Sequence, residues 1–145
     1  MKKILLINGP NLNLLGKREP AYYGQKTLSE IEEMVKAEGM EMGVEVITFQ
    51  SNHEGEIIDF IQDNSILADG IIINPGAFTH YSYAIYDALI ATSLPIVEVH
   101  LSNIFAREDF RATSVISPIA KGVISGLGYK GYLYALNYLS ELLDV

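Results

Sequence analysis

The stretch KKILLINGP, residues 2–10, decides the fold. Two lysines and an Asn-Gly-Pro turn bound four consecutive apolar residues, Ile4 to Ile7. A short, unbroken apolar run of this kind is typical of a strand buried on both faces, and such strands belong to parallel sheets with helices on both sides. We therefore expect a strand over Lys2–Ile7 in an α/β fold.

The rest of the chain alternates helix and strand signals. Thr27 and Glu30 form a capping box that opens a helix ending near Gly39 or Gly43, and Ser51 with Glu54 predicts another capping box. Further strands are expected over 44–49, 70–73, 94–99 and 123–125, and further helices over 81–91 and 129–143. Because right-handed crossovers leave few other solutions, this order favours a flavodoxin-like three-layer sandwich with a five-stranded parallel sheet in the order 2-1-3-4-5.

Length and composition narrow the class of protein. A chain of 145 residues that is 49% hydrophobic and 19% charged is the size of one folded domain, so residues 1–145 are expected to form a single domain. Cysteine is absent, which excludes disulfides, a thiolate nucleophile and cysteine-ligated metals. The apolar run after the first lysines is too short for a secretory signal, and no stretch approaches the roughly 20 apolar residues of a membrane span. We expect a cytoplasmic protein with no membrane partner.

The charge balance bears on possible partners. The net charge of −8 argues against nucleic acid or anionic lipid as a partner. Any anionic ligand must then be held by local positive charge, and the chain has only three arginines, Arg18, Arg107 and Arg111. The mean hydropathy of +0.20 is high for a small chain and predicts apolar surface for a homo-oligomer.

The predicted fold also indicates where a ligand would bind. Ligands of such sheets bind beyond the carboxyl ends of the strands, next to the switch point between strands one and three, which here means segments 8–26, 74–80 and 100–111. These segments contain all three arginines and two of the three histidines. Their other polar candidates are Asn8, Asn11, Asn13, Tyr22, Tyr23, Asn74, Thr79, Ser102 and Asn103. Each alone is an ordinary turn or core residue, but together they predict a binding site.

Several kinds of site fit poorly. Asn8 and Asn74 stand where a phosphoryl-accepting domain of this fold needs carboxylates, and a metal-dependent site is not expected. The amide-rich, apolar loop 8–15 lacks the hydroxyls of a flavin phosphate site. The G-x-G-x-x-G motif at 126–131 has only 14 residues after Gly131, too few for a dinucleotide domain, so we interpret its glycines as close helix–sheet packing. We expect neither a metal nor a cofactor.

The remaining residue types suit proton abstraction next to a carbonyl. Arg18 lies five residues before Tyr23, and a nearby guanidinium lowers the pKa of a phenol. Strand alternation places Glu98 and His100 on one face, where the carboxylate would orient the imidazole as a general acid, although Glu98 could also be a solvated edge residue. Asparagine amides would stabilise an enolate oxygen. The alternative is a non-enzymatic module that clamps a small anion, or carries a flavin for electron transfer.

Several sequence blocks resemble the type II 3-dehydroquinate dehydratases. The blocks are NGPNL at 8–12, REPAYYG at 18–24, NPGA at 74–77 with Thr79 and His80, EVHLSN at 98–103, ARE at 106–108 and GVISGLG at 122–128. They occur in order over essentially the whole chain. The resemblance implies a flavodoxin-like subunit of a homododecamer, a tetramer of trimers. It also implies the third step of the shikimate pathway in aromatic amino acid biosynthesis, a cofactor-free anti dehydration of 3-dehydroquinate to 3-dehydroshikimate through an enolate.

The resemblance further implies roles for individual residues. Tyr23 would be the proton acceptor and Arg18 the stabiliser of the transition state, while Tyr22 falls at a variable position. Asn11 would hold the water that stabilises the enolate, and His100, oriented by Glu98, would be the proton donor. The substrate would be bound by Asn74, His80, Leu101, Ser102, Arg111 and, from a neighbouring subunit, Asp87, with Arg107 in support. Residues 14–26 would form a mobile lid.

Overall fold

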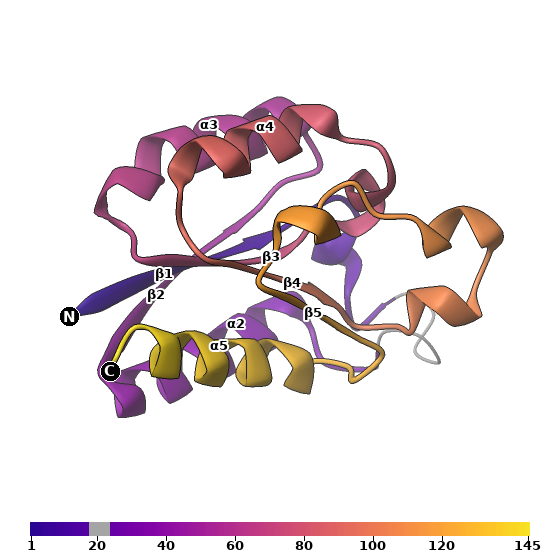
Figure 1. The fold of residues 1–145 in the computed structure, drawn as a ribbon. Coiled ribbons are helices and arrows are strands. Elements are labelled where there is room, and N and C mark those ends of the chain that lie inside the picture. The colour runs from indigo at the N-terminus through magenta and orange to yellow at the C-terminus, as the bar shows by residue number, and fades with distance from the viewer. Residues whose placement is uncertain (18–23) are drawn as a thin grey trace.

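The computed structural model describes residues 1–17 and 24–145, and within them a five-stranded parallel sheet runs through the middle of the molecule (Figure 1). The strands are β1 (Lys2–Asn8), β2 (Val44–Gln50), β3 (Gly70–Asn74), β4 (Ile96–His100) and β5 (Gly122–Ser125). Their order is β2-β1-β3-β4-β5, which confirms the predicted flavodoxin-like topology. The register places Asn8, at the end of β1, opposite Gln50 of β2 and Asn74 of β3.

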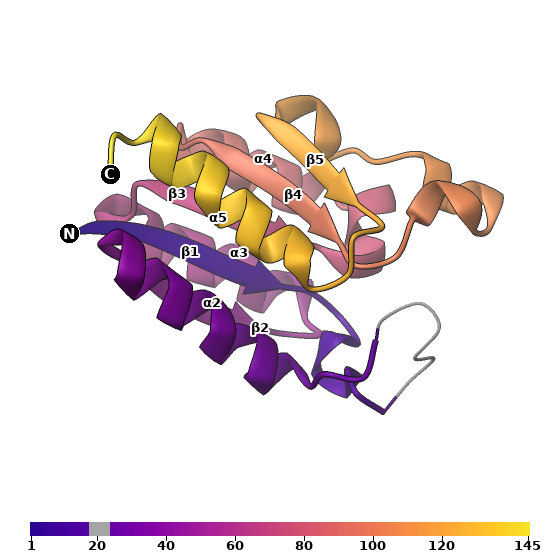
Figure 2. The same ribbon diagram turned by 90° about the horizontal axis from the view of Figure 1, so that it is seen from below.

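Two helices cover each face of the sheet. Helices α2 (Leu28–Met42) and α5 (Lys130–Leu142) lie on one face, and α3 (Glu54–Asn64) and α4 (Tyr83–Thr92) lie on the other (Figures 1 and 2). Side chains of β1 alternate between the two cores: Ile4 packs on the side of α2 and α5, whereas Leu5 packs on the side of α3 and α4. Both are fully buried, as the first apolar run predicts.

Helix α2 begins and ends as two local signals predict. The Glu30 N–H donates to Thr27 Oγ1 at 3.2 Å, and the Thr27 N–H donates to Glu30 Oε1 at 3.3 Å, which completes the capping box. Gly43 ends the helix in the left-handed conformation with φ 80°. Gly39 lies within the helix, where a Cβ would come within 2.8 Å of Val46 Cγ2, so this glycine lets α2 approach β2 closely.

The predicted capping box at Ser51 is wrong. Helix α3 has His53 at its N-cap position with no side-chain cap. The Ser51 hydroxyl instead accepts from the His53 N–H at 2.9 Å and donates to the Glu56 carboxylate. The helix therefore starts with Glu54 as its first residue rather than its third, because the serine stabilises the turn before the helix.

The segment before α4 also differs from prediction. Residues 76–80 form a separate 3-10 helix, η3 (Gly76–His80), and α4 then starts at Tyr83 with Ser82 as its cap, so the predicted helix over 81–91 begins two residues too early. The Ser82 hydroxyl accepts from the Ile85 N–H at 3.1 Å. Because η3 directly follows the carboxyl end of β3, Thr79 and His80 lie at the predicted site.

The interpretation of the glycines at 126–131 as helix–sheet packing is correct for Gly131 but wrong for Gly128, where a Cβ would have no neighbour within 4 Å, and for Gly126, where it would meet Asn103. A Cβ at Gly131 would lie 3.1 Å from Val99 Cγ1 and 3.2 Å from Ile124 Cγ2, which confirms close helix–sheet packing at this position. Gly126 instead adopts φ 94° and leads the chain past Asn103.

Across the described part of the chain, no helix combines the length and apolar character that crossing a membrane requires.

Candidate active site

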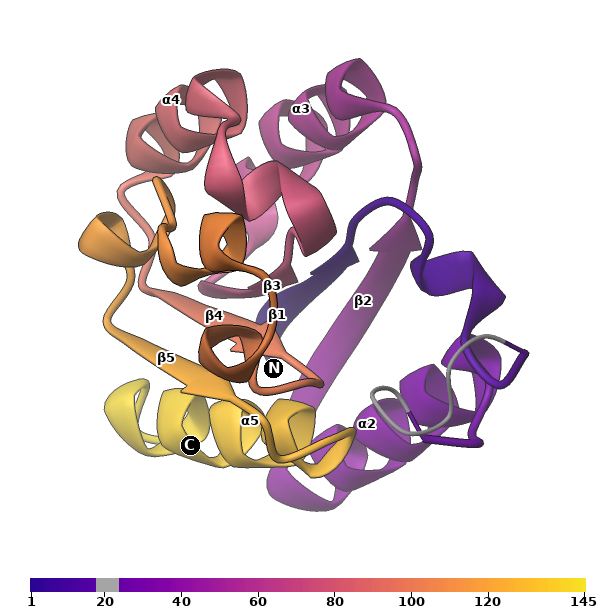
Figure 3. The same ribbon diagram turned by 90° about the vertical axis from the view of Figure 1, so that its right-hand side faces the viewer.

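A cavity of about 90 Å³ opens at the carboxyl ends of β1, β3 and β4. Figure 3 looks onto this edge of the sheet, where three loop regions meet. Every described lining residue comes from one of the three segments that the sequence singles out. These residues are Pro10, Asn11, Leu12, Asn74, Gly76, Ala77, His80, His100, Leu101, Ser102, Ile104, Arg107 and Arg111.

The loop after β1 places Asn11 on the wall of the cavity. Asn11 adopts the left-handed conformation with φ 70°, which asparagine tolerates better than most residues, and its N–H donates to Asn52 Oδ1 at 2.9 Å. The short helix η1 (Leu12–Leu14) follows, and Leu12 and Leu15 are buried in the core. These anchors fix the position of Asn11 relative to the sheet.

A buried network orients the Asn74 amide at the end of β3. Asn74 Oδ1 accepts from the Gly76 N–H at 3.1 Å, and Asn74 Nδ2 donates to the Tyr132 hydroxyl at 3.0 Å. That hydroxyl in turn donates to Asn8 Oδ1 at 2.6 Å. An amide has two N–H donors and an oxygen with two lone pairs, so one N–H and one lone pair of Asn74 stay available to a ligand.

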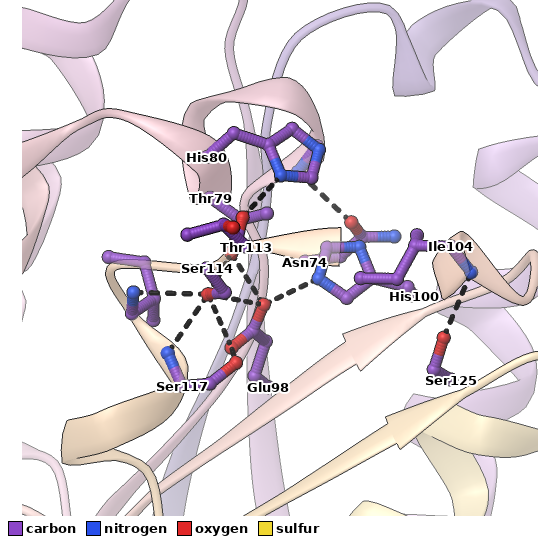
Figure 4. Close-up of polar contacts among 12 residues, drawn as sticks. Asn74, Thr79, His80, Glu98, His100, Ile104, Thr113, Ser114, Ser117 and Ser125 are labelled. Atoms are coloured by element: carbon purple, nitrogen blue, oxygen red, sulfur yellow. Dashed lines mark hydrogen bonds and ion pairs between the residues drawn. The ribbon is translucent and has the colours of Figure 1, made fainter. Parts of the chain in front are cut away.

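The centre of the site is a buried imidazole–carboxylate pair (Figure 4). His100 Nε2 lies 2.5 Å from Glu98 Oε2, and the two residues are 5% and 0% exposed. Strand alternation correctly predicts this contact, and the alternative of a solvated Glu98 is wrong. Burial alone would raise the pKa of the Glu98 carboxyl, but hydrogen bonds from His100, Ser117 and Thr79, with the charge of His100, hold that pKa below its usual 4.5.

Three hydroxyl groups also contact the Glu98 carboxylate. Thr79 Oγ1 donates to Oε2 at 2.5 Å, Ser117 Oγ donates to Oε1 at 2.6 Å, and Ser114 Oγ lies 3.3 Å from both oxygens. Sequence reasoning includes Thr79 among the polar candidates but misses Ser114 and Ser117. Both serines lie in an irregular stretch before β5, and a lone loop serine carries no signal of its contacts.

The arginines give the cavity a positive side. Arg107 Nη1 donates to Ser102 Oγ at 3.1 Å, and Arg111 Nε donates to Glu108 Oε2 at 2.9 Å. The hydrogen bond from Arg111 lowers the pKa of the Glu108 carboxyl, which stays ionised as a partner. His80 lies nearby with Nδ1 2.7 Å from the Thr113 carbonyl oxygen. Two guanidinium groups in one small cavity favour an anionic ligand.

The structure brings most of the predicted site residues together. Eight of them line the cavity: Asn11, Asn74, His80, His100, Leu101, Ser102, Arg107 and Arg111. Glu98 lies next to His100, outside the lining. Asp87 is exposed on α4 and does not line the cavity of its own chain. Arg18, Tyr22 and Tyr23 lie outside the described residues, as does the central part of the predicted lid over 14–26.

This arrangement supports acid–base chemistry on a small anion. An imidazole beside an ionised carboxylate is suited to general acid–base catalysis, amide groups offer hydrogen bonds to an oxygen, and guanidinium groups bind carboxylates. Fold and site together define a flavodoxin-like α/β protein with the features of an acid–base enzyme.

Comparisons with known proteins identify the family. Residues 2–140 match the family described as "Dehydroquinase class II". The chain is 56% identical to a 3-dehydroquinate dehydratase of Halothermothrix orenii over 143 residues, which cover 99% of this chain and 97% of that protein. It is 57% identical to one of Roseiflexus castenholzii over 137 residues, which cover 94% of this chain and 87% of that protein.

Solved structures support the same family assignment. The type II dehydroquinase of Butyrivibrio crossotus superimposes with a TM-score of 0.93 at 50% identity, covering 96% of this chain and 97% of that one. The enzyme of Propionibacterium acnes gives a TM-score of 0.93 at 42% identity, with 97% of both chains covered. The chain therefore belongs to the class II dehydroquinase family, which confirms the resemblance seen in its sequence blocks.

Proposed function

We propose that this protein is a hydro-lyase that dehydrates 3-dehydroquinate to 3-dehydroshikimate in the shikimate pathway. The observation that carries the proposal is the buried His100–Glu98 pair at the cavity, in a chain of this family. Elimination of water needs a group that protonates the departing hydroxyl, and an imidazole held by an ionised carboxylate is such a group.

The contact with Glu98 determines which ring nitrogen of His100 is proposed to carry the proton for the substrate. Nε2 faces Glu98 Oε2, so Nδ1 is the ring nitrogen left for the substrate. In the proposed reaction, the Nδ1–H proton passes to the departing hydroxyl, which leaves as water. Glu98 stays ionised throughout and stabilises the imidazolium before the transfer.

The first half of the proposed reaction is removal of a proton next to the substrate carbonyl. Tyr23 is the proposed proton acceptor and Arg18 stabilises its phenolate and the transition state. The electrons of the broken C–H bond form an enolate, whose oxygen receives a hydrogen bond from a water held by Asn11. The enolate then expels the hydroxyl, and an anti elimination of this kind requires no cofactor.

Substrate binding is assigned to the remaining cavity residues. Leu101 and Ser102 would lie near the substrate carboxylate, with Arg107 in support through its bond to Ser102. Asn74, His80 and Arg111 would also hold the substrate.

The proposed assembly and domain organisation complete the site. Asp87, exposed on α4, would reach the site of a neighbouring subunit in a homododecamer built as a tetramer of trimers. Residues 14–26 would cover the bound substrate, and residues 1–145 would act as one catalytic domain. Light scattering tests the assembly: a monomer in solution would contradict it.

An ultraviolet assay tests the proposed activity. Purified protein is mixed with 3-dehydroquinate in the presence of EDTA, and absorption by the conjugated enone of the product is followed. The proposal predicts a growing enone band whose rate EDTA does not change. A folded, oligomeric sample that produces no band would contradict the proposal and favour the alternative of a non-enzymatic anion-binding module.

A further inference from the structure

The environment of Glu98 is unusually rich in hydroxyl donors for a fully buried carboxylate. Thr79 belongs to η3, whereas Ser114 and Ser117 belong to the stretch before β5, where Ser117 opens the short helix η6 (Ser117–Ile119). Figure 4 shows the three hydroxyl groups around the carboxylate, with His100 on a separate approach. Two loops far apart in sequence therefore converge on one side chain.

Hydrogen bonds within these loops leave the hydroxyl hydrogens of Ser114 and Thr79 to be donated toward Glu98. Ser114 Oγ accepts from the N–H groups of Ile116 at 3.1 Å and Ser117 at 3.0 Å, so its own hydrogen is free to be donated. It lies 2.8 Å from Thr79 Oγ1, whose hydrogen is given to Glu98. The Val115 N–H also donates to the Thr79 carbonyl at 2.8 Å, which joins the two loops.

The hydrogen-bond donors around Glu98 favour the ionised form of its carboxyl group. Thr79 and Ser117 each donate to Glu98, and an ionised carboxylate can only accept, whereas His100 Nε2 donates or accepts according to its tautomer. A protonated Glu98 would need one of these groups to become an acceptor. Each donor therefore stabilises the ionised form, and hydrogen bonds to a charged group are the stronger kind.

The strand partners of Glu98 and the hydroxyls that contact it are uncharged. In register beside it lie Ile73 of β3 and Val123 of β5, and η3 and the stretch before β5 present hydroxyls. His100 is a titratable side chain in direct contact with Glu98, and its charge lowers the pKa of the Glu98 carboxyl. The competition for one proton is therefore between Glu98 and His100.

We propose that Ser117 and Thr79, with Ser114 behind them, are positioning residues that keep Glu98 ionised and thereby keep the acidic proton on His100. Without these donors the proton would move to Glu98 in part of the molecules, leaving a neutral imidazole, whose N–H is a far weaker acid than that of an imidazolium. This inference rests on the proposed function, because it assigns His100 the role of general acid.

The first test is the pH profile of kcat for Ser117→Ala. Loss of a donor destabilises the ionised Glu98, so the acidic limb of the profile should move up by about one pH unit, and kcat at neutral pH should fall about tenfold. Ser117→Thr keeps the hydroxyl and should restore both values. Ser140→Ala is the control, since this serine also donates a hydrogen bond within the protein but bonds to the Asn137 carbonyl in α5, away from Glu98.

Two further variants separate positioning from structural damage. Thr79→Val removes the second hydroxyl with little change in shape and should move the acidic limb in the same direction. In a His100→Ala background, Ser117→Ala should lower the residual kcat no further. Losses in kcat with an unmoved acidic limb, or full additivity with His100→Ala, would overturn the proposal.

An infrared titration gives a result that does not depend on turnover. The C=O band of protonated Glu98, identified by its absence in Glu98→Gln, should appear at higher pH in Ser117→Ala than in the unsubstituted protein. If the unsubstituted protein does not dehydrate 3-dehydroquinate but the band shifts as expected, the proposed function fails and the role of the hydroxyls stands. An unshifted band in folded Ser117→Ala would contradict that role.

Discussion

The hydroxyl of Tyr132 donates to Asn8 Oδ1 at 2.6 Å, although 124 residues separate the two along the chain. Because the same hydroxyl accepts from Asn74 Nδ2, it joins α5 to the carboxyl ends of β1 and β3. Burial raises the pKa of Tyr132 far above its ordinary value, so the phenol stays protonated and acts as a structural donor. One side chain thus connects the core to the wall of the cavity.

Tyr132→Phe should destabilise the protein. The substitution leaves Asn8 Oδ1 and one Asn74 N–H buried without this partner, and such groups cost about 1–3 kcal/mol. Urea unfolding should show this loss in the free energy of unfolding, whereas Tyr134→Phe, on the exposed side of α5, should change it little. Equal stability of Tyr132→Phe and the unsubstituted protein would show that the network does not hold the strand ends.

The fold was predictable from sequence because its signals are local. The apolar run at the start of β1 and the capping box at Thr27 reflect backbone and burial preferences that a few neighbouring residues determine. The contact of Glu98 with His100 was also predictable, since two residues that alternate along a strand share a face. Ser51 shows the limit: the same S-x-x-E pattern fits both a helix cap and a turn before the helix.

The rest of the site depends on tertiary contacts that leave no local pattern. Ser117 reaches Glu98 across 19 positions, and Tyr132 reaches Asn8 across 124 positions. A serine in a loop and a tyrosine in an amphipathic helix have ordinary local explanations. Only the packing of α5 and of the stretch before β5 against the sheet brings these side chains to the site.

Stability should depend on pH through Glu98. The pKa of this carboxyl is lower in the folded protein than its usual 4.5, so the folded state binds fewer protons than the unfolded chain between the two values. Its stabilising contribution is therefore present above about pH 4.5 and is lost as pH falls through the folded pKa. Relative to Glu98→Gln, the protein should lose free energy of unfolding over that acidic range.

Chemical unfolding between pH 7 and pH 3 measures this dependence. Glu45→Gln serves as the control, because Glu45 is exposed on β2 with its carboxylate 3.8 Å from Lys3. A stability difference between the protein and Glu98→Gln that stays constant with pH would mean that Glu98 is not held ionised by its surroundings.

The proposed base can be tested with a pair of adjacent residues. Tyr23→Phe should abolish turnover with little loss of substrate binding, because it removes the proton acceptor but keeps the ring. Tyr22→Phe should have a mild effect, which makes it the matched control. Steady-state kinetics and substrate titration of both variants give the comparison, and similar losses in the two would refute the assignment of Tyr23.

We expect Arg18 to act through the phenolate of Tyr23. Arg18→Gln should lower kcat sharply, since a nearby guanidinium charge lowers the pKa of a tyrosine by about 1–3 units and the neutral amide does not. The pH profile of kcat should then shift to higher pH as the phenol becomes harder to ionise. A variant with an unchanged kcat and pH profile would separate Arg18 from the activation of Tyr23.

The most direct measurement compares the protein with His100→Ala for dehydration of 3-dehydroquinate, with kcat and KM determined for both. The unsubstituted protein should form the enone product. His100→Ala should lose about 10²- to 10⁴-fold in kcat with a small change in KM, because a general acid acts in the transition state. Absence of turnover in the folded protein, or a loss confined to KM in the variant, would contradict the role of His100 as the proton donor.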